Sequence, residues 1–328
     1  MQVWIRTEAS AQIGLGHFMR CFAVAEAARH RGMAVTFLLN ESTEAIRSRL
    51  AQIGAGCRRL ETAIGSPQDA AAIRACVPTG EVLLVDSYAA VAAFYTDLCA
   101  DYRLAVFDDL AQVRPLNVHL VINAAASASP EMYAEIAPDA QLCLGPDYAP
   151  IRHEFRRSYP TSGRAHISVL FGGSDPKGFT ALCAQALLEV APRYDIRLIV
   201  GPANRDVDAL RRLCAAHAAL KLYLSPDNVA EVLSGASLVV TAAGGSVGEV
   251  AAMGLPALVM VVVDNQAALL SASPYPVLDA REGWPDDFKD KVKTLLSDVL
   301  GRVTEAARAH ALVDGRGAKR IVEAMTRV

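Results

Sequence analysis

The stretch VWIRTEASAQIGLGHFMRCFAVAEAARHRG, residues 3–32, decides the fold class. It opens with a short apolar run rich in β-forming residues. After a glycine-rich turn it continues with alanine and apolar residues at helical spacing, up to the stop signal Gly32. The segment therefore predicts a strand, a turn and a helix. In an α/β chain such a turn binds anions, because the backbone N–H groups that begin the helix point toward the ligand.

A histidine directly follows the second glycine of this turn. Gly14 and Gly16 would let the backbone approach a ligand without a Cβ atom in the way. The positive end of the helix favours a neutral imidazole at His17, which can accept a proton from water or from a hydroxyl group. His17 is therefore a candidate general base, and the alternative is that it caps the turn or only hydrogen-bonds the substrate. Arg20 lies one helical turn after Gly16, where it could bind an anion or form a salt bridge to a neighbouring strand end.

The rest of the chain repeats this alternation of strand-like and helical stretches. In the first half we expect strands at residues 3–7, 34–39, 81–86, 103–109 and 118–124, and helices at 16–31, 42–53 and 91–100. In the second half, strand-bearing runs begin at residues 166, 196, 220, 236 and 255, and a helical tail follows from Lys289 to Val328 with breaks at Gly301 and Gly315. Such alternation implies right-handed crossovers and parallel sheets covered on both faces.

The length of 328 residues fits two domains. A segment rich in proline, glycine, serine and charge predicts the boundary between them. We expect an N-terminal Rossmann-like domain at residues 1–150, a linker at 151–164, and a C-terminal domain at 165–328 that includes the last helices. Two doubly wound α/β domains of this kind would face each other across a cleft between the carboxyl ends of their strands, where the ligand is expected.

Composition excludes several classes of function. The net charge of −3 and pI near 6.2 provide no basic field, so no nucleic-acid partner is expected. The apolar runs are shorter than the roughly 20 residues of a membrane span, and no secretory signal is recognisable, so the protein is expected to be cytoplasmic with no membrane partner. The 7 cysteines are scattered and never form a CxxC pair, and the histidines share no ligand spacing. No disulfide framework and no metal site are indicated.

Asp86 and Tyr88 follow a predicted strand of the first half. Carboxylates at such strand ends face the ligand side of a parallel sheet, although many of them only cap the next helix or turn. Asp86 could therefore contact substrate or orient a catalytic group, and Tyr88 is equally placed. Asp108 and Asp109 end the next strand-like run in the same way.

Two glycine turns and one polar turn follow strands of the second half. The candidates there are Gly172, Gly173 and Ser174 in the first, Gly244, Gly245 and Ser246 in the second, and Asn265 and Gln266 in the third. The glycine turns predict anion binding. Glu249, three residues after Ser246, fits either a capping box or a carboxylate that binds the hydroxyl groups of a ribose, and spacing alone favours the capping box. The amides at 265 and 266 could bind a base or a sugar, or could hold a structural turn.

Taken together and in this order, the motifs GLGHFMRC, VDSY, FGGSDP, AAGGSVGE with GLP, and DNQ resemble one known family. It is the family of UDP-2,4-diacetamido-2,4,6-trideoxy-β-L-altropyranose hydrolases of pseudaminic acid biosynthesis. That family is related to the undecaprenyl-linked muramoyl-peptide N-acetylglucosaminyltransferase. The resemblance extends to about Gln266 and implies a GT-B fold with two Rossmann-like domains.

The resemblance also implies roles for the candidate residues. The C-terminal domain would hold UDP, with 172–174 and 244–246 near the diphosphate and Glu249 on the ribose. His17 would deprotonate the water that attacks the anomeric carbon with inversion, and Asp86 and Tyr88 would line the sugar and water site. No cofactor is implied, and the oligomeric state is not indicated. Two alternatives stay open: a UDP-sugar-dependent GT-B glycosyltransferase, and a nucleotide-sugar binding protein without turnover.

Overall fold

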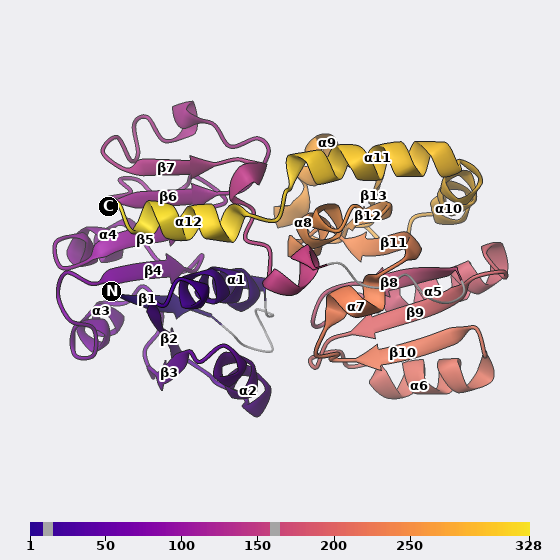
Figure 1. Ribbon diagram of the computed structural model, residues 1–328, viewed down its shortest axis with the longest axis horizontal. Coiled ribbons are helices and arrows are strands. Elements are labelled where there is room, and N and C mark those ends of the chain that lie inside the picture. The colour runs from indigo at the N-terminus through magenta and orange to yellow at the C-terminus, as the bar shows by residue number, and fades with distance from the viewer. Residues whose placement is uncertain (9–15, 158–164) are drawn as a thin grey trace. The chain divides into compact units, whose positions relative to one another are not determined.

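Figure 1 shows a computed structural model of the protein, which describes residues 1–8, 16–157 and 165–328. Its contacts divide the chain into two compact units. Unit 1 comprises Met1–His153 together with Gly315–Val328, and unit 2 comprises Glu154–Asp314. Each unit is an α/β structure built on its own parallel sheet.

Unit 1 contains a seven-stranded sheet in the order β3-β2-β1-β4-β5-β6-β7, with all neighbours parallel. The order reverses between β1 and β4, and in open α/β sheets ligands bind at the carboxyl ends of the strands beside such a reversal. The strands are β1 (Gln2–Thr7), β2 (Ala34–Leu39), β3 (Gly56–Arg59), β4 (Val82–Asp86), β5 (Arg103–Phe107), β6 (Leu120–Asn123) and β7 (Gln141–Leu144).

Helices cover both faces of this sheet. They are α1 (Gly16–His30), α2 (Glu44–Gln52), α3 (Pro67–Arg74), α4 (Ala92–Cys99) and α12 (Gly317–Met325), with short 3₁₀ turns η1 (Pro130–Met132) and η2 (Pro146–Tyr148). A third such turn, η3 (His153–Arg156), spans the boundary between the units. One apolar core joins the sheet to α1, α2 and α12, and a second joins its other face to α3 and α4. Thr43 and Ser66 begin α2 and α3, and their hydroxyl oxygens accept from backbone N–H groups of the first turn.

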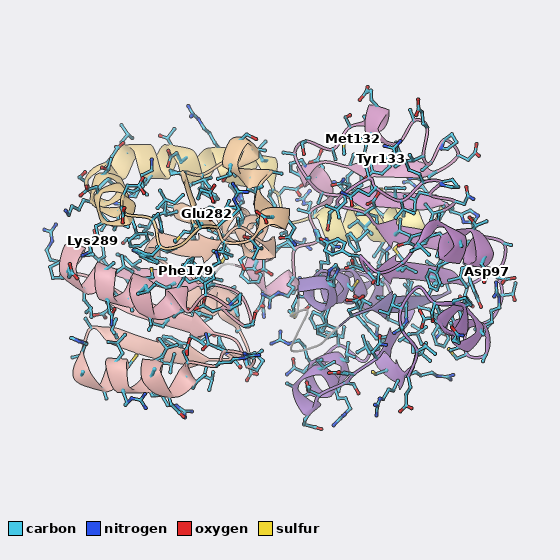
Figure 2. All side chains as sticks on the ribbon, turned by 180° about the vertical axis from the view of Figure 1, so that it is seen from behind. Asp97, Met132, Tyr133, Phe179, Glu282 and Lys289 are labelled. Atoms are coloured by element: carbon cyan, nitrogen blue, oxygen red, sulfur yellow. The ribbon has the colours of Figure 1, made fainter. Side chains whose placement is uncertain are left out.

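Unit 2 contains a six-stranded parallel sheet in the order β10-β9-β8-β11-β12-β13, which reverses between β8 and β11. Its strands are β8 (His166–Leu170), β9 (Asp195–Val200), β10 (Leu220–Leu224), β11 (Ala236–Ala242), β12 (Ala257–Val261) and β13 (Val277–Asp279). Its helices are α5 (Phe179–Val190), α6 (Val207–Ala216), α7 (Val229–Leu233), α8 (Gly245–Ala252), α9 (Leu269–Ala272), α10 (Phe288–Ser297) and α11 (Val299–Leu312), and η4 (Asp264–Gln266) follows β12. Figure 2 shows side chains filling the space between helices and sheet in each unit.

The C-terminal tail differs from the sequence expectation in two ways. The last helix, α12, belongs to unit 1 and not to the C-terminal domain, because its apolar residues Ile321, Val322 and Met325 are buried in the core beside α1. The predicted break at Gly301 is wrong: this residue lies in the first turn of α11, where its N–H donates to Asp298 Oδ1 at 2.8 Å. The break at Gly315 is confirmed, since the residue adopts a φ of 74° between α11 and α12.

None of the helices in the described residues combines the length and the apolar character needed to cross a bilayer.

The attachment of α12 to unit 1 leads to a stability prediction. Ile321 is completely buried, so Ile321→Ala should lower the free energy of unfolding of unit 1 by about 2–5 kcal/mol. The chain contains 2 tryptophans, Trp4 in unit 1 and Trp284 in unit 2, so a Trp284→Phe background makes fluorescence report on unit 1 during denaturant unfolding. The control is Val303→Ala, because Val303 is exposed on α11 of unit 2. Equal effects of the two variants would contradict the packing of α12 on unit 1.

Candidate functional site

The candidate site of unit 1 lies at the carboxyl ends of β1 and β4. The parallel register places Thr7 opposite Asp86, so both strands end at the same edge of the sheet. Helix α1 begins at Gly16 and carries His17 and Arg20 to this edge. The sequence candidate Gly14 lies outside the described residues.

The side chains of His17 and Asp86 form a short hydrogen bond. Nδ1 of His17 lies 2.6 Å from Oδ1 of Asp86, whose side chain is fully buried. An ionised carboxylate can only accept, so Nδ1–H is the donor, and in the neutral ring Nε2 carries the lone pair. Among the described residues no hydrogen bond to Nε2 is formed. An imidazole held in this way is an oriented general base.

Arg20 neutralises the same carboxylate. Its Nε and Nη2 atoms lie 2.6 Å from Oδ2 and Oδ1 of Asp86, a two-point ion pair, and Nη1 lies 2.7 Å from Oδ2 of Asp109. The guanidinium also lies over the ring of Phe107, with Cζ at 4.7 Å from its centroid. The sequence left two roles open for Arg20, anion binding or a salt bridge to a strand end. The structure shows the salt bridge.

Burial and charge have opposite effects on Asp86. Burial alone would raise the pKa of this carboxyl group, but the charge and hydrogen bonds of Arg20, together with His17, outweigh it and hold the pKa below its usual range. Burial would lower the pKa of Arg20, but the two carboxylates, Asp86 and Asp109, outweigh it and raise this pKa well above its ordinary value. The pair is therefore ionised, which fixes the proton on Nδ1 of His17.

Tyr88 and Asp109 complete the cluster. The hydroxyl group of Tyr88 donates to Asp109 Oδ2 at 2.7 Å, and its ring meets the imidazole of His17 edge-on with centroids 4.7 Å apart. Burial and the charge of Asp109 raise the pKa of Tyr88, so it remains a neutral phenol. Asp109 thus links Arg20 to Tyr88. The sequence indicated this residue only as a strand-end carboxylate, and its place after β5, the neighbour of β4, is the signal that could have shown its role.

In unit 2 the three predicted turns follow β8, β11 and β12, which are adjacent in the sheet, so they meet at one edge. The first turn favours glycine at 172, which has a φ of 77°, and it packs so closely on Gly201 that a Cβ atom on Gly201 would lie 2.4 Å from Gly173 Cα. Ser174 follows, but α5 begins only at Phe179. The first N–H groups of that helix donate to the Asp175 carboxylate, at 3.0 Å from Phe179 N and 2.8 Å from Thr180 N. A ligand at this turn would therefore meet the glycine backbone and not the helix end.

The second turn leads directly into α8. Gly244 is the N-cap residue and has no side chain to cap the helix, so Ser246 does not occupy the N-cap position that the expected capping box with Glu249 requires. The reason is that the helix begins at Gly245, which places Ser246 inside the first turn. Gly244 and Gly245 are exposed, and a Cβ atom on either would meet no other atom within 4 Å. This helix start has the form of an anion-binding site.

The third turn is η4. Gln266 has a structural role there, because its Oε1 accepts from the backbone N–H of Val262 at 3.0 Å. Asn265 is exposed beside it, and Asp264 forms an ion pair with Arg281 at 3.1 Å. In the part of the chain that the structure describes, no group of three or more metal-ligating side chains is found.

Comparisons with known proteins place this geometry in context. No protein-family model matches the chain. An uncharacterized protein of Methanocaldococcus jannaschii is 23% identical over 100% of this chain and 66% of its own length. The spore coat polysaccharide biosynthesis protein SpsG of Bacillus subtilis is 26% identical over 56% of this chain and 57% of its own. The chain therefore spans just under two thirds of the first of these relatives.

Solved structures match along the whole chain. MurG of Acinetobacter baumannii and HepE of Anabaena in complex with UDP each superpose with a TM-score of 0.66 at 14% identity, covering 100% of both chains. The UDP-GlcNAc 2-epimerase of Neisseria meningitidis bound to UDP-GlcNAc gives the same TM-score at 11% identity, again over 100% of both chains. With its two parallel-sheet α/β units, the protein has the GT-B fold, as the sequence predicted.

The ionised Asp86 predicts an acid-sensitive step in stability. Because its pKa is lower in the folded protein than the 3.8 of an unperturbed carboxyl group, its stabilising contribution is full above about pH 4 and is lost as the pH falls through the folded value. Asp86→Asn should therefore be less stable at pH 7 and should lose less stability between pH 5 and about pH 2. Urea unfolding across this range measures the difference, with the exposed Asp139→Asn as control. Parallel curves for Asp86→Asn and wild type would contradict the assignment.

Proposed function

We propose that this protein is an enzyme that uses a UDP-sugar and breaks the bond between the anomeric carbon and UDP, with His17 as the general base. The observation that carries the proposal is the 2.6 Å contact of His17 Nδ1 with the buried, ionised Asp86. It leaves the Nε2 lone pair to accept the proton of an attacking O–H group. The oxygen forms a bond to the anomeric carbon as the C–O bond to UDP breaks, and UDP leaves with the electron pair.

Asp86 supports this step in two ways. It fixes the tautomer and orientation of His17, and its charge stabilises the imidazolium that forms when the proton arrives. Arg20 prevents Asp86 from taking the proton itself, because the ion pair holds the carboxyl group ionised. Tyr88, edge-on to the imidazole, is proposed to line the space in which the attacking group lies.

The UDP-binding role belongs to unit 2 in this proposal. Exposed glycine backbone at Gly172–Ser174 and at the start of α8 offers N–H groups to a diphosphate, whose charge they would take up as it leaves. Glu249, which is not part of a capping box, is proposed to bind the ribose. The Anabaena and Neisseria structures that share this fold hold UDP and UDP-GlcNAc, which supports a nucleotide of this kind.

Two acceptors are candidates for the attacking group. The comparisons favour the hydroxyl group of another molecule, since the solved structures of the same fold include glycosyltransferases and an epimerase, and SpsG is named for polysaccharide biosynthesis. The protein would then be a UDP-sugar-dependent glycosyltransferase. The comparisons support this candidate better than hydrolysis.

Water is the second candidate, and the order of the sequence motifs favours it. GLGHFMRC, FGGSDP and AAGGSVGE resemble the hydrolases of pseudaminic acid biosynthesis, whose substrate is UDP-2,4-diacetamido-2,4,6-trideoxy-β-L-altropyranose. The same oriented imidazole would serve either acceptor. The choice between water and a hydroxyl group therefore has to be made by identifying the reaction product.

The base assignment is tested by His17→Ala. Turnover of the UDP-sugar should fall by about 10² to 10⁴, the range for a general base, while the Kd for UDP changes little. Proton NMR of the protein with the 2,4-diacetamido UDP-sugar, with and without a sugar acceptor, follows UDP release and the anomeric configuration of the product. A free inverted sugar identifies water as the acceptor, and a glycoside identifies transfer.

The matched control is His217→Ala, because this histidine is exposed and belongs to unit 2, whereas the cluster belongs to unit 1. It should retain full turnover. If His17→Ala kept turnover within a few-fold of wild type, the protein would be using another base or binding the nucleotide sugar without chemistry.

The nucleotide site is tested by Gly245→Ala. A Cβ atom at this position meets no protein atom within 4 Å, so the fold should be unchanged. It would project where the proposed diphosphate approaches the backbone, and the Kd for UDP should rise at least about tenfold. Isothermal titration calorimetry measures the affinity, with Asp139→Ala as the control because Asp139 is exposed and lies in unit 1 outside the candidate site. An unchanged Kd would contradict the proposal that the diphosphate binds at the start of α8.

A further inference from the structure

Helix α11 packs against α8 and α10 in unit 2 (Figure 1). Its outer side carries the most exposed large apolar side chains among the described residues, with exposed fractions of 78% for Leu300, 60% for Val299 and 57% for Val303. The inner side of the helix packs in unit 2, where Ala306 and Ala309 are buried. Contiguous exposed apolar side chains are typical of an interaction surface, and none of the steps proposed above uses this one.

The exposed apolar residues form a stripe along α11. Its members are exposed and follow one another at intervals of three and four residues, so they lie on one side of the helix: Leu300, Val303, Ala307 and Ala311. The larger side chains occupy the first half of this α11 stripe and the alanines occupy the second half. A second helix with the same stripe, running in the opposite direction, therefore has a shape complementary to it.

Two charges flank the α11 stripe near its opposite ends. Asp298 begins the helix, and its Oδ1 accepts from the backbone N–H of Gly301 at 2.8 Å. Its Oδ2 lies where a Cβ atom on Gly301 would be, so the carboxylate takes the place of a side chain at this position. Arg308 is exposed seven residues after Gly301, about two turns along the same side of the helix. A carboxylate and a guanidinium thus lie on one flank, about 10 Å apart.

We propose that the α11 stripe is the contact surface of a homodimer, in which it packs antiparallel on the α11 stripe of a second copy of the chain. The two-fold axis passes beside Val303 and Thr304, so each of these residues lies next to its own copy. Leu300 and Ala307 are equally far from this axis, and Leu300 of each copy packs on Ala307 of the other. A large side chain on a small one lets the two helices approach closely. This inference does not depend on the proposed function.

The same arrangement pairs the charges. Arg308 of each copy lies level with the beginning of the other α11, on the flank that carries the Asp298 carboxylate, so symmetry gives two ion pairs. A parallel pair would place every residue level with its own copy, and it would bring neither the complementary shapes nor the opposite charges together. Because α11 has 14 residues and is about 21 Å long, one pair of these helices covers less than the roughly 1,600 Å² of a standard interface. We therefore expect a weak dimer.

Sedimentation velocity of the full chain from about 1 to 500 µM tests the dimer, for which we expect a Kd of about 1–100 µM. Leu300→Glu places a charge in the α11 stripe and should raise this Kd at least about tenfold. The control is Val91→Glu, since Val91 is 54% exposed and lies in unit 1, and it should keep the wild-type Kd. A wild-type protein that stays monomeric throughout, or a dimer that Leu300→Glu leaves intact, would overturn the proposal.

An exchange of the large and small residues tests the register. Leu300→Ala alone should raise the Kd at least about tenfold, because each copy loses apolar contact with the other. The double variant Leu300→Ala, Ala307→Leu again sets a leucine against an alanine on each side of the axis. Its Kd should return to within about threefold of wild type. A double variant that dimerises as weakly as Leu300→Ala would contradict the proposed pairing.

Disulfide formation tests the direction of the two helices. Val303→Cys should give a disulfide-linked dimer on mild oxidation, because position 303 lies beside its own copy at the axis. Ala307→Cys should not, since its two copies are separated by seven residues, about 10 Å along the helices. Wild type gives the background, as all seven of its cysteines are buried or half-buried. Linkage through Ala307→Cys, or none through Val303→Cys, would overturn the antiparallel arrangement.

Discussion

The candidate site of unit 1 depends on one buried charge, the carboxylate of Asp86. A carboxylate without solvent is tolerated only when cations and hydrogen-bond donors replace the water it has lost. Arg20 and His17 provide them from successive turns of α1, and the strand pairing of β1 with β4 brings the helix and the carboxylate together. Arg20 in turn reaches Asp109, which holds Tyr88. Removing the charge at Asp86 would therefore affect every member of this cluster.

Much of the fold could be predicted from hydrophobic periodicity. Central strands such as β1, β4, β8 and β11 are almost continuous apolar runs, as expected when both faces of a parallel sheet are covered. The edge strands β3, β7 and β13 were missed because they are short and partly exposed, with four, four and three residues. Helix α12 could be predicted as a helix but not assigned to unit 1, since an amphipathic pattern does not say which core receives its apolar face.

The candidate site, too, could be predicted from the sequence only in part. Strand-end positions of Asp86 and Tyr88 could be read from the sequence, because parallel strands present their carboxyl ends on one side. The bridging role of Asp109 could not, since it depends on which strand lies next to β4. Local signals failed where one motif fits two structures: Ser246 and Glu249 have capping-box spacing, yet Gly244 is the N-cap and the helix begins at Gly245. Asp175, in contrast, caps α5 from outside any recognised motif.

The chemistry of the base does not select the acceptor. An imidazole oriented by a carboxylate removes a proton from water or from a sugar hydroxyl by the same step, so one fold can support hydrolysis and transfer. The choice must come from the groups around the attacking oxygen. In unit 1 the ring that meets the imidazole edge-on is that of Tyr88, which Asp109 holds in place. A change in the groups that pack against the imidazole can therefore alter the acceptor without altering the base.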